Sequence, residues 1–145
     1  MITVLVAQPN VKFASALAEP LLAAGYRAIT CPGPWPPALR CIRCDVGYCP
    51  LTEAADLLIY DPDLVAHGAD GQCHILAVDS ANAHPDVPLL LAWPGPDEPA
   101  SVSAVVAEVP RAQRALTEPD DLVGQVRQLV GPPFGTVPVR RTPVS

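Results

Sequence analysis

The sequence has no hydrophobic run long enough to cross a membrane. A spanning helix needs about 20 consecutive apolar residues, and the apolar runs of this 145-residue chain are much shorter. The amino terminus, MITVLVAQPN, has no basic residue before its apolar run, and Gln8 and Pro9 interrupt that run. These features are not typical of a signal peptide. We therefore expect no membrane segment and a cytoplasmic protein.

Positive charge is also scarce. Nine lysine and arginine residues stand against fifteen aspartate and glutamate residues, and the net charge is −6. An acidic surface repels nucleic-acid phosphates and anionic lipids, which argues against both as partners. Half of the residues are hydrophobic, so the chain can bury the core of a single domain and is not disordered as a whole.

Several motifs of catalysis are missing as well. The sequence has no Ser/His/Asp order, no glycine-rich phosphate loop and no paired carboxylate motif. We therefore expect a protein that is not an enzyme and that acts through another protein, whose identity the sequence does not reveal. The chain could also pair with a second copy of itself.

Five short apolar runs predict β-strands. Continuous runs of aliphatic and β-branched residues are typical of strands that are buried on both faces, as in a parallel sheet. The four clear runs and one weaker run lie at residues 2–6, 26–30, 56–60, 88–93 and 113–116. Strands of this kind that alternate with helices predict an α/β domain with a doubly wound parallel sheet.

The first helical pattern follows the first run. Asn10 is a suitable N-cap residue, and apolar residues then recur at every fourth position. Gly25 is placed to end the helix. Pro20 lies inside the pattern and should kink it.

Three more helical patterns follow. The segment 72–83 is predicted to be a helix, although its residues 74–78 (HILAV) could form a strand. Valines at helical spacing predict a helix over 102–109. Thr117 and Asp120 are predicted to cap the last helix, which ends at a Gly-Pro-Pro sequence. We expect one domain over residues 1–131 and an extended or disordered tail over 132–145.

The order of these elements resembles the receiver domain of bacterial response regulators. The resemblance rests on VLVAQPN, ADLLIYDPD, VPLLLAW and ALTEPDDL, and covers roughly residues 2–130. It implies a flavodoxin-like sheet of five parallel strands in the order 2-1-3-4-5. In that family the first strand ends in an acidic pair that binds magnesium, and the third ends in the aspartate that accepts the phosphoryl group. The fourth ends in threonine or serine, and the fifth in Lys-Pro.

Residue by residue, the resemblance supports the fold and not the chemistry. Asp61 matches the phosphate-accepting aspartate, but Gln8 and Pro9 stand where the acidic pair would be. Trp93 replaces the threonine or serine, and Glu118 replaces the lysine. Mg²⁺ prefers carboxylate oxygens, and phosphoryl transfer depends on that ion. The resemblance therefore implies a degenerate pseudo-receiver, a signalling module that is not phosphorylated.

Four of the five cysteines lie in one proline-rich segment, CPGPWPPALRCIRCDVGYC. Cys31, Cys41, Cys44 and Cys49 are separated by nine, two and four residues. In a reducing compartment, clustered cysteines are more typical of metal ligands or reactive thiols than of disulfides. A CxxC pair can bind one ion, and two further thiolates complete a tetrahedral Zn²⁺ site. We predict that such a site, with zinc favoured, orders the loop 31–50.

Two alternatives use the same cysteines. The sequence Cys49-Pro50 resembles the end of ferredoxin-type motifs, and the spacing is distantly similar to that of the actinobacterial WhiB-type cluster proteins. An iron–sulfur cluster here would make the protein a redox or iron sensor. A thiol oxidoreductase that uses Cys41 and Cys44 is the third hypothesis, although its CxxC would be expected at the start of a helix.

Topology predicts where this loop begins. The carboxyl ends of parallel strands share one rim of the sheet, where open α/β folds place their ligand sites. Cys31 follows the second strand, so we expect the loop to begin on the rim that also holds Gln8, Asp61, Trp93 and Glu118. Cys73 and His74 would add a ligand if their loop approaches this rim. Otherwise they are an interior thiol and a surface imidazole.

Overall fold

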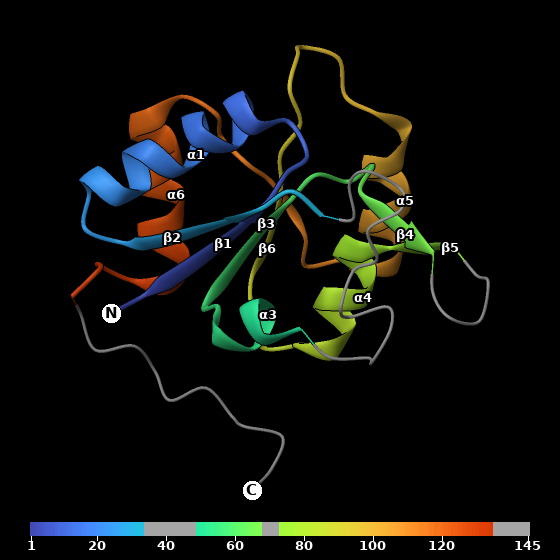
Figure 1. Ribbon diagram of the computed structural model, residues 1–145, viewed down its shortest axis with the longest axis horizontal. Helices are drawn as coiled ribbons and strands as arrows, with labels where there is room; N and C mark the ends of the chain where they lie inside the picture. Colours follow the sequence, from blue (N-terminus) through green and yellow to red (C-terminus); the bar gives the residue numbers. More distant parts are fainter. Residues whose placement is uncertain (34–48, 68–72, 135–145) are drawn as a thin grey trace, which may run out of the picture.

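The computed structural model describes residues 1–33, 49–67 and 73–134. Within these residues, five parallel strands form one sheet in the order β2-β1-β3-β6-β7 (Figure 1). In chain order they are β1 (Thr3–Ala7), β2 (Arg27–Cys31), β3 (Leu57–Tyr60), β6 (Leu89–Leu91) and β7 (Gln113–Arg114). The labels β4 and β5 belong to a separate two-stranded hairpin. When only the strands of the main sheet are numbered along the chain, their order is 2-1-3-4-5. The predicted α/β class is confirmed.

The central strands are buried because helices cover both faces of the sheet. Every residue of β1, β3 and β6 is buried. Helices α1 (Val11–Ala23) and α6 (Pro119–Val130) pack on the face that holds Val4 and Val6. Helices α4 (Leu76–Ala83) and α5 (Ala100–Glu108) pack on the other face. Alternate residues of each strand thus enter two separate hydrophobic clusters.

Helix α1 begins and ends as the sequence predicts. The Asn10 side-chain oxygen accepts a hydrogen bond from the Phe13 backbone N–H at 3.0 Å. Pro20 lies inside the helix. Gly25 follows the C-cap and has a φ of +100°, a conformation that favours glycine.

Other local predictions were incomplete. Residues 74–78 divide between a strand and a helix, because β5 (Cys73–Ile75) ends where α4 begins, and β5 pairs antiparallel with β4 (Val65–His67). This short apolar run fits either periodicity, so the sequence could not separate them. Helix α3 (Pro50–Ala54) was also not predicted.

The predicted capping pair of the last helix was wrong. The N-cap of α6 is Glu118, and no side chain caps this helix. Pro119 occupies the first turn, where its missing N–H leaves one fewer donor to satisfy.

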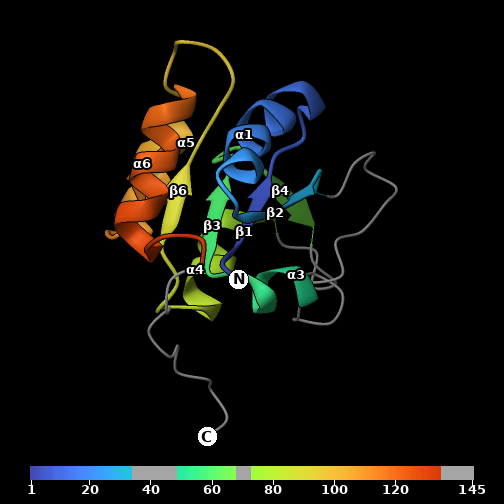
Figure 2. The same cartoon turned by 90° about the vertical axis from the view of Figure 1, so that its left-hand side faces the viewer.

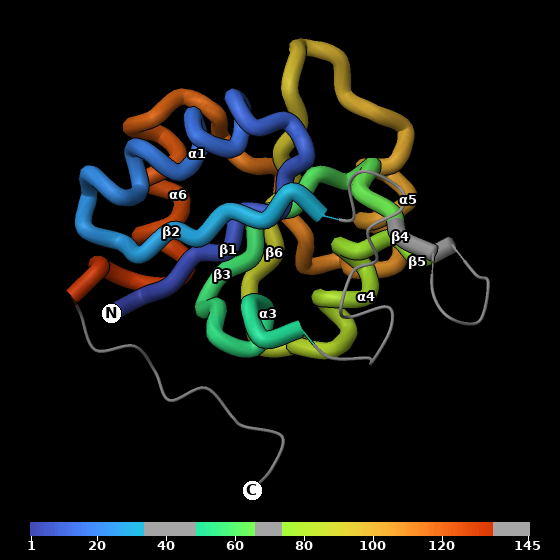
Figure 3. The backbone as a smooth tube through the Cα atoms, viewed as in Figure 1, coloured from blue at the N-terminus to red at the C-terminus, as the bar shows by residue number. Residues whose placement is uncertain are grey.

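The segment that follows α6 returns to the amino end of the sheet, beside the amino terminus (Figure 3). The Tyr26 hydroxyl donates to the Gly131 carbonyl at 2.7 Å, and the Ile2 N–H donates to the Pro133 carbonyl at 3.4 Å. The rest of the predicted tail, residues 135–145, lies outside the described residues. No helix in the described part of the chain is both long and apolar enough to cross a membrane.

Candidate functional site at the carboxyl rim

The carboxyl rim of the sheet holds the four positions that the sequence comparison singled out. Gln8 directly follows β1, and Asp61 directly follows β3. Trp93 lies two residues past β6, and Glu118 lies between β7 and α6. These positions therefore share one rim, but their side chains lie in different environments.

Asp61 is buried and held by its neighbours. Its side chain accepts a hydrogen bond from the Asp63 N–H at 2.8 Å, and the residue is only 6% exposed. Burial raises the pKa of the Asp61 carboxyl above its ordinary value, and hydrogen bonds from the Asp63 backbone and the Gln8 side chain oppose that rise. The carboxylate is thus already engaged by protein donors.

Gln8 links the ends of three strands. Its side-chain oxygen accepts from the Asn10 N–H at 3.0 Å, and its amide nitrogen donates to the Ala92 carbonyl at 3.4 Å. The same side chain hydrogen-bonds to Asp61. Gln8 is 2% exposed, so its neutral amide is a buried bridge between β1, β3 and β6.

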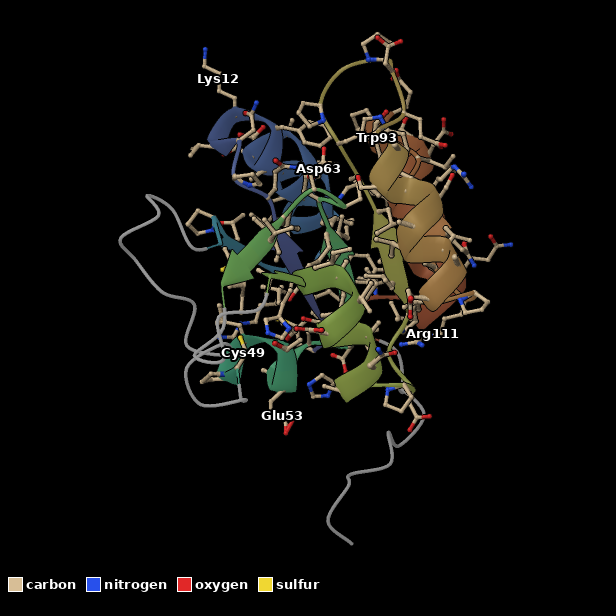
Figure 4. The ribbon with its side chains drawn as sticks, turned by 90° about the vertical axis from the view of Figure 1, so that its right-hand side faces the viewer. Lys12, Cys49, Glu53, Asp63, Trp93 and Arg111 are labelled. Carbon is tan, nitrogen blue, oxygen red and sulfur yellow. The ribbon has the colours of Figure 1, made fainter. Side chains whose placement is uncertain are left out.

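A second carboxylate at this rim was missed by sequence reasoning. Asp63 accepts a hydrogen bond from the Ser101 hydroxyl, at the start of α5, at 2.5 Å. The Asp-Pro-Asp sequence was the available signal, and it was interpreted only as a turn. Figure 4 shows Asp63 and Trp93 at the same end of the molecule. Across residues 1–33, 49–67 and 73–134, no group of three or more His, Cys, Asp or Glu side chains could hold a metal ion.

Trp93 fills the position that carries a hydroxyl group in receivers. Its half-buried indole packs against the cluster on the α4–α5 face. Beside it lies a pocket of about 290 Å³, lined mainly by apolar side chains that include Phe13 and Pro96. Glu118 is exposed. Among the described residues, those that line this pocket include no basic side chain that could hold a phosphate.

The structure describes two of the four clustered cysteines. Cys31 is half-buried at the carboxyl end of β2. Cys49 is half-buried at the N-cap of α3, and α3 leads to Asp56, whose carboxylate accepts from the Thr3 N–H at the amino end of β1. The end of β2 lies well apart from α3 in both views (Figures 1 and 2). Because Cys41 and Cys44 lie outside the described residues, the metal site stays a prediction.

The fifth cysteine lies in the hairpin. Cys73 pairs with His67 across the β4–β5 ladder. The neighbouring His74 imidazole lies 3.2 Å from the Asp79 carboxylate, at the start of α4. These contacts place His74 beside α4 and leave its predicted role as a further ligand untested.

The opposite rim carries structural contacts. The Arg111 guanidinium donates to the Ala81 carbonyl at 2.9 Å and to the His84 carbonyl at 3.1 Å, both at the carboxyl end of α4. The His84 imidazole lies 3.3 Å from the Glu53 carboxylate of α3. Figure 4 shows Glu53 and Arg111 at the end of the molecule that lies away from Trp93. These residues fasten α4 to its neighbours.

Solved structures from two Burkholderia species are similar to this fold. One is from Burkholderia thailandensis and is described as a pilus assembly protein (cpaE); it aligns with a TM-score of 0.58 and 22% identity, over 89% of this chain and 98% of that one. The other, a pilus assembly-related protein from Burkholderia pseudomallei, aligns with a TM-score of 0.56 and 23% identity, over 89% of each chain. No protein-family model and no curated protein matches the sequence.

Proposed function

We propose that this chain is a receiver-like regulatory module that does not accept a phosphoryl group and acts by binding another protein. The observation that carries the proposal is the contact between Asp61 and Gln8. At the position where a receiver has metal-binding carboxylates, this chain has a buried amide whose oxygen and nitrogen both have protein partners. An amide in this state supplies no charge to attract Mg²⁺, and phosphoryl transfer needs that cation to neutralise developing charge.

The other rim positions support the same proposal. A receiver uses a hydroxyl group and a lysine to hold the transferred phosphoryl group. Here Trp93 and Glu118 occupy those positions. A carboxylate at position 118 repels a phosphate, so the rim would disfavour the product of the reaction as well as the metal ion.

Intact-mass measurement tests the proposal directly. The full chain is incubated with Mg²⁺ and acetyl phosphate, with a phosphorylatable receiver treated in parallel to show that the reagents are active. We expect no phosphate adduct on this chain. An adduct that forms on the natural chain and is absent from Asp61→Asn would overturn the proposal.

A non-phosphorylated module has to transmit information through contacts. Of the similar solved structures named above, one is described as a pilus assembly protein and the other as a pilus assembly-related protein. Proteins of pilus assembly systems are therefore the first class of partner to test.

We propose further that the clustered cysteines bind a metal ion, with Zn²⁺ favoured. The support is the spacing of Cys31, Cys41, Cys44 and Cys49 in the sequence. Cys31 and Cys49 adjoin opposite ends of the sheet, whereas one Zn²⁺ ion holds each of its thiolates at about 2.3 Å. Each cysteine is therefore replaced separately by serine, to find which of them bind the ion. Cys73→Ser tests in the same way whether Cys73 supplies a further ligand.

Anaerobic purification followed by metal analysis and a visible spectrum distinguishes the three cysteine hypotheses. Colourless protein with bound zinc that is lost in Cys44→Ser supports a zinc site. Brown protein with iron and sulfide overturns zinc in favour of a cluster and a sensor. Metal-free protein with a titratable Cys41 and Cys44 pair overturns both and favours a thiol oxidoreductase.

A further inference from the structure

Strand β7 has an outer edge that faces away from the sheet. On its inner side, the Ala115 N–H donates to the Leu91 carbonyl of β6 at 2.8 Å. Backbone groups alternate in direction along a strand, so the Arg114 carbonyl and the Leu116 N–H point outward. Within the described residues β7 is the last strand on this side. Outward groups of this kind are a template for pairing with another strand.

The Gln125 side chain binds both outward groups. Its oxygen accepts from the Leu116 N–H at 2.8 Å, and its amide nitrogen donates to the Arg114 carbonyl at 3.0 Å. One carboxamide thus makes the same pair of hydrogen bonds that the N–H and C=O of one residue in a parallel neighbouring strand would make. Gln125 comes from α6, so the helix supplies a substitute for a sixth strand.

A shallow groove of about 630 Å³, largely open to solvent, lies between β7 and α6. Leu116 lies in it and is 51% exposed, so its side chain is available for apolar contact. Asp120 and Asp121, both exposed in the first turn of α6, line the groove near Leu116. Arg127 lines it two turns further along the helix.

We propose that this groove binds an extended, positively charged peptide segment of a partner protein. The segment would displace the Gln125 amide and form strand pairing with Arg114 and Leu116. An apolar side chain of the segment would pack on Leu116, and its basic side chains would lie next to Asp120 and Asp121. The charge of the partner follows from these two carboxylates and from the net charge of −6 on the chain. Recognition of extended peptides at a sheet edge is a common mode of binding.

The groove would be the surface through which the regulatory module of the proposed function binds its partner. This inference rests on the proposed function only in taking the partner to be a protein. Phosphorylation at Asp61 would overturn the proposed function without affecting peptide binding in this groove. Failure of peptide binding would leave the chemistry of Asp61 unchanged. Each proposal can therefore be overturned without the other.

The experiment is an NMR titration of the full chain with a short synthetic peptide that alternates arginine and valine. We expect the Leu116 backbone amide and the Gln125 side-chain amide to shift together as the peptide is added. Gln125→Ala should bind the peptide about tenfold to thirtyfold more tightly, because both hydrogen bonds of the internal competitor are gone. Asn82→Ala, on an exposed residue of α4 that lies outside the groove, is the matched control.

Further variants separate strand pairing from simple charge attraction. A peptide of the same sequence with alternate backbone nitrogens methylated keeps its charge and cannot pair with the edge, so it should not shift the Leu116 amide. Asp120→Asn/Asp121→Asn should weaken binding of the unmodified peptide, whereas Asp86→Asn, an exposed carboxylate outside the groove, should not. Equal binding of the methylated peptide, or no shift at Leu116, would overturn the proposal. Shifts at Leu116 that depend on protein concentration without peptide would overturn it in favour of a second copy of the chain.

Discussion

The side-chain amide of Gln8 donates to the main-chain oxygen of Ala92 at 3.4 Å. The contact joins the carboxyl ends of β1 and β6, and the same side chain also hydrogen-bonds to Asp61 at the end of β3. An uncharged amide thus connects the carboxyl ends of three strands.

Removal of this bridge should destabilise the fold. Gln8→Ala removes the partner of the Ala92 carbonyl and of the Asn10 N–H and one of the hydrogen bonds to the Asp61 carboxylate, at an expected loss of about 2–3 kcal/mol of unfolding free energy. Urea denaturation measures the change. Gln128→Ala, at an exposed position, should have little effect. Equal midpoints for Gln8→Ala and the natural chain would contradict the bridging role.

The pKa of Asp61 predicts a pH dependence of stability. Burial raises this pKa in the folded state above the ordinary value of 3.8. The folded chain therefore holds this proton more tightly than the unfolded chain does, and stability declines as the pH rises from about 3.8 through the raised value. Asp61→Asn cannot lose a proton there and keeps a side-chain oxygen for the Asp63 N–H. As the pH rises through this range, the unfolding free energy of Asp61→Asn should therefore increase relative to that of the natural chain.

Chemical denaturation at a series of pH values tests this expectation. Other carboxylates titrate equally in both proteins, so their contributions cancel in the difference. A difference that stays constant with pH above 3.8 would show that burial does not control the Asp61 carboxyl.

Replacement of Gly25 and of Gly124 by alanine should change the stability of the protein in opposite directions. Gly25 has a φ of +100°, and an added Cβ would lie 3.0 Å from the Phe134 ring. Gly25→Ala should therefore cost about 1–2 kcal/mol, through backbone strain and this close contact. Gly124 lies within α6, where an added Cβ would meet nothing within 4 Å. Gly124→Ala should stabilise the protein by about 0.5–1 kcal/mol. Thermal melting measures both variants. A change of the melting temperature in the same direction for both would contradict the different backbone environments assigned to these glycines.

A buried hydroxyl pair should couple β3 to α4. The Ser80 hydroxyl donates to the Tyr60 hydroxyl oxygen at 2.9 Å, and Ser80 is fully buried. Tyr60→Phe and Ser80→Ala should each destabilise the protein by about 1–2 kcal/mol. The double variant should lose less than the sum, because both single changes break the same hydrogen bond. Strict additivity in urea denaturation would show that the two hydroxyls act independently.

The fold was largely predictable because its central strands β1, β3 and β6 are fully buried. Residues 2–6 and 56–60 were predicted as strands from continuous apolar runs; β3 lies within the second range, and β1 extends one residue beyond the first, to Ala7. The β4–β5 hairpin escaped prediction because each strand has only three residues, too few to show a period. Capping of α6 by Thr117 was wrong for a different reason: cap geometry depends on the path of the chain, which composition does not specify.

The candidate site was predictable only in part. The identities of Gln8, Pro9 and Asp61 were enough to predict that the chemistry of a receiver is missing. The bonding of Gln8 to Ala92 joins residues 84 positions apart, and no local pattern indicates it. Gln125 likewise resembled any other polar residue on a helix surface until its contacts with Arg114 and Leu116 were known.

The amino-acid sequence was therefore sufficient for the class of the fold, the order of its main strands and the absence of a carboxylate at positions 8 and 9, because these depend on residue type and on periodicity along the chain. The tertiary structure alone decided that Gln8 bridges three strands, that Cys31 and Cys49 adjoin opposite ends of the sheet, and that Gln125 covers the outer edge of β7. Each of these facts depends on which distant segments the packing of the two hydrophobic clusters brings together.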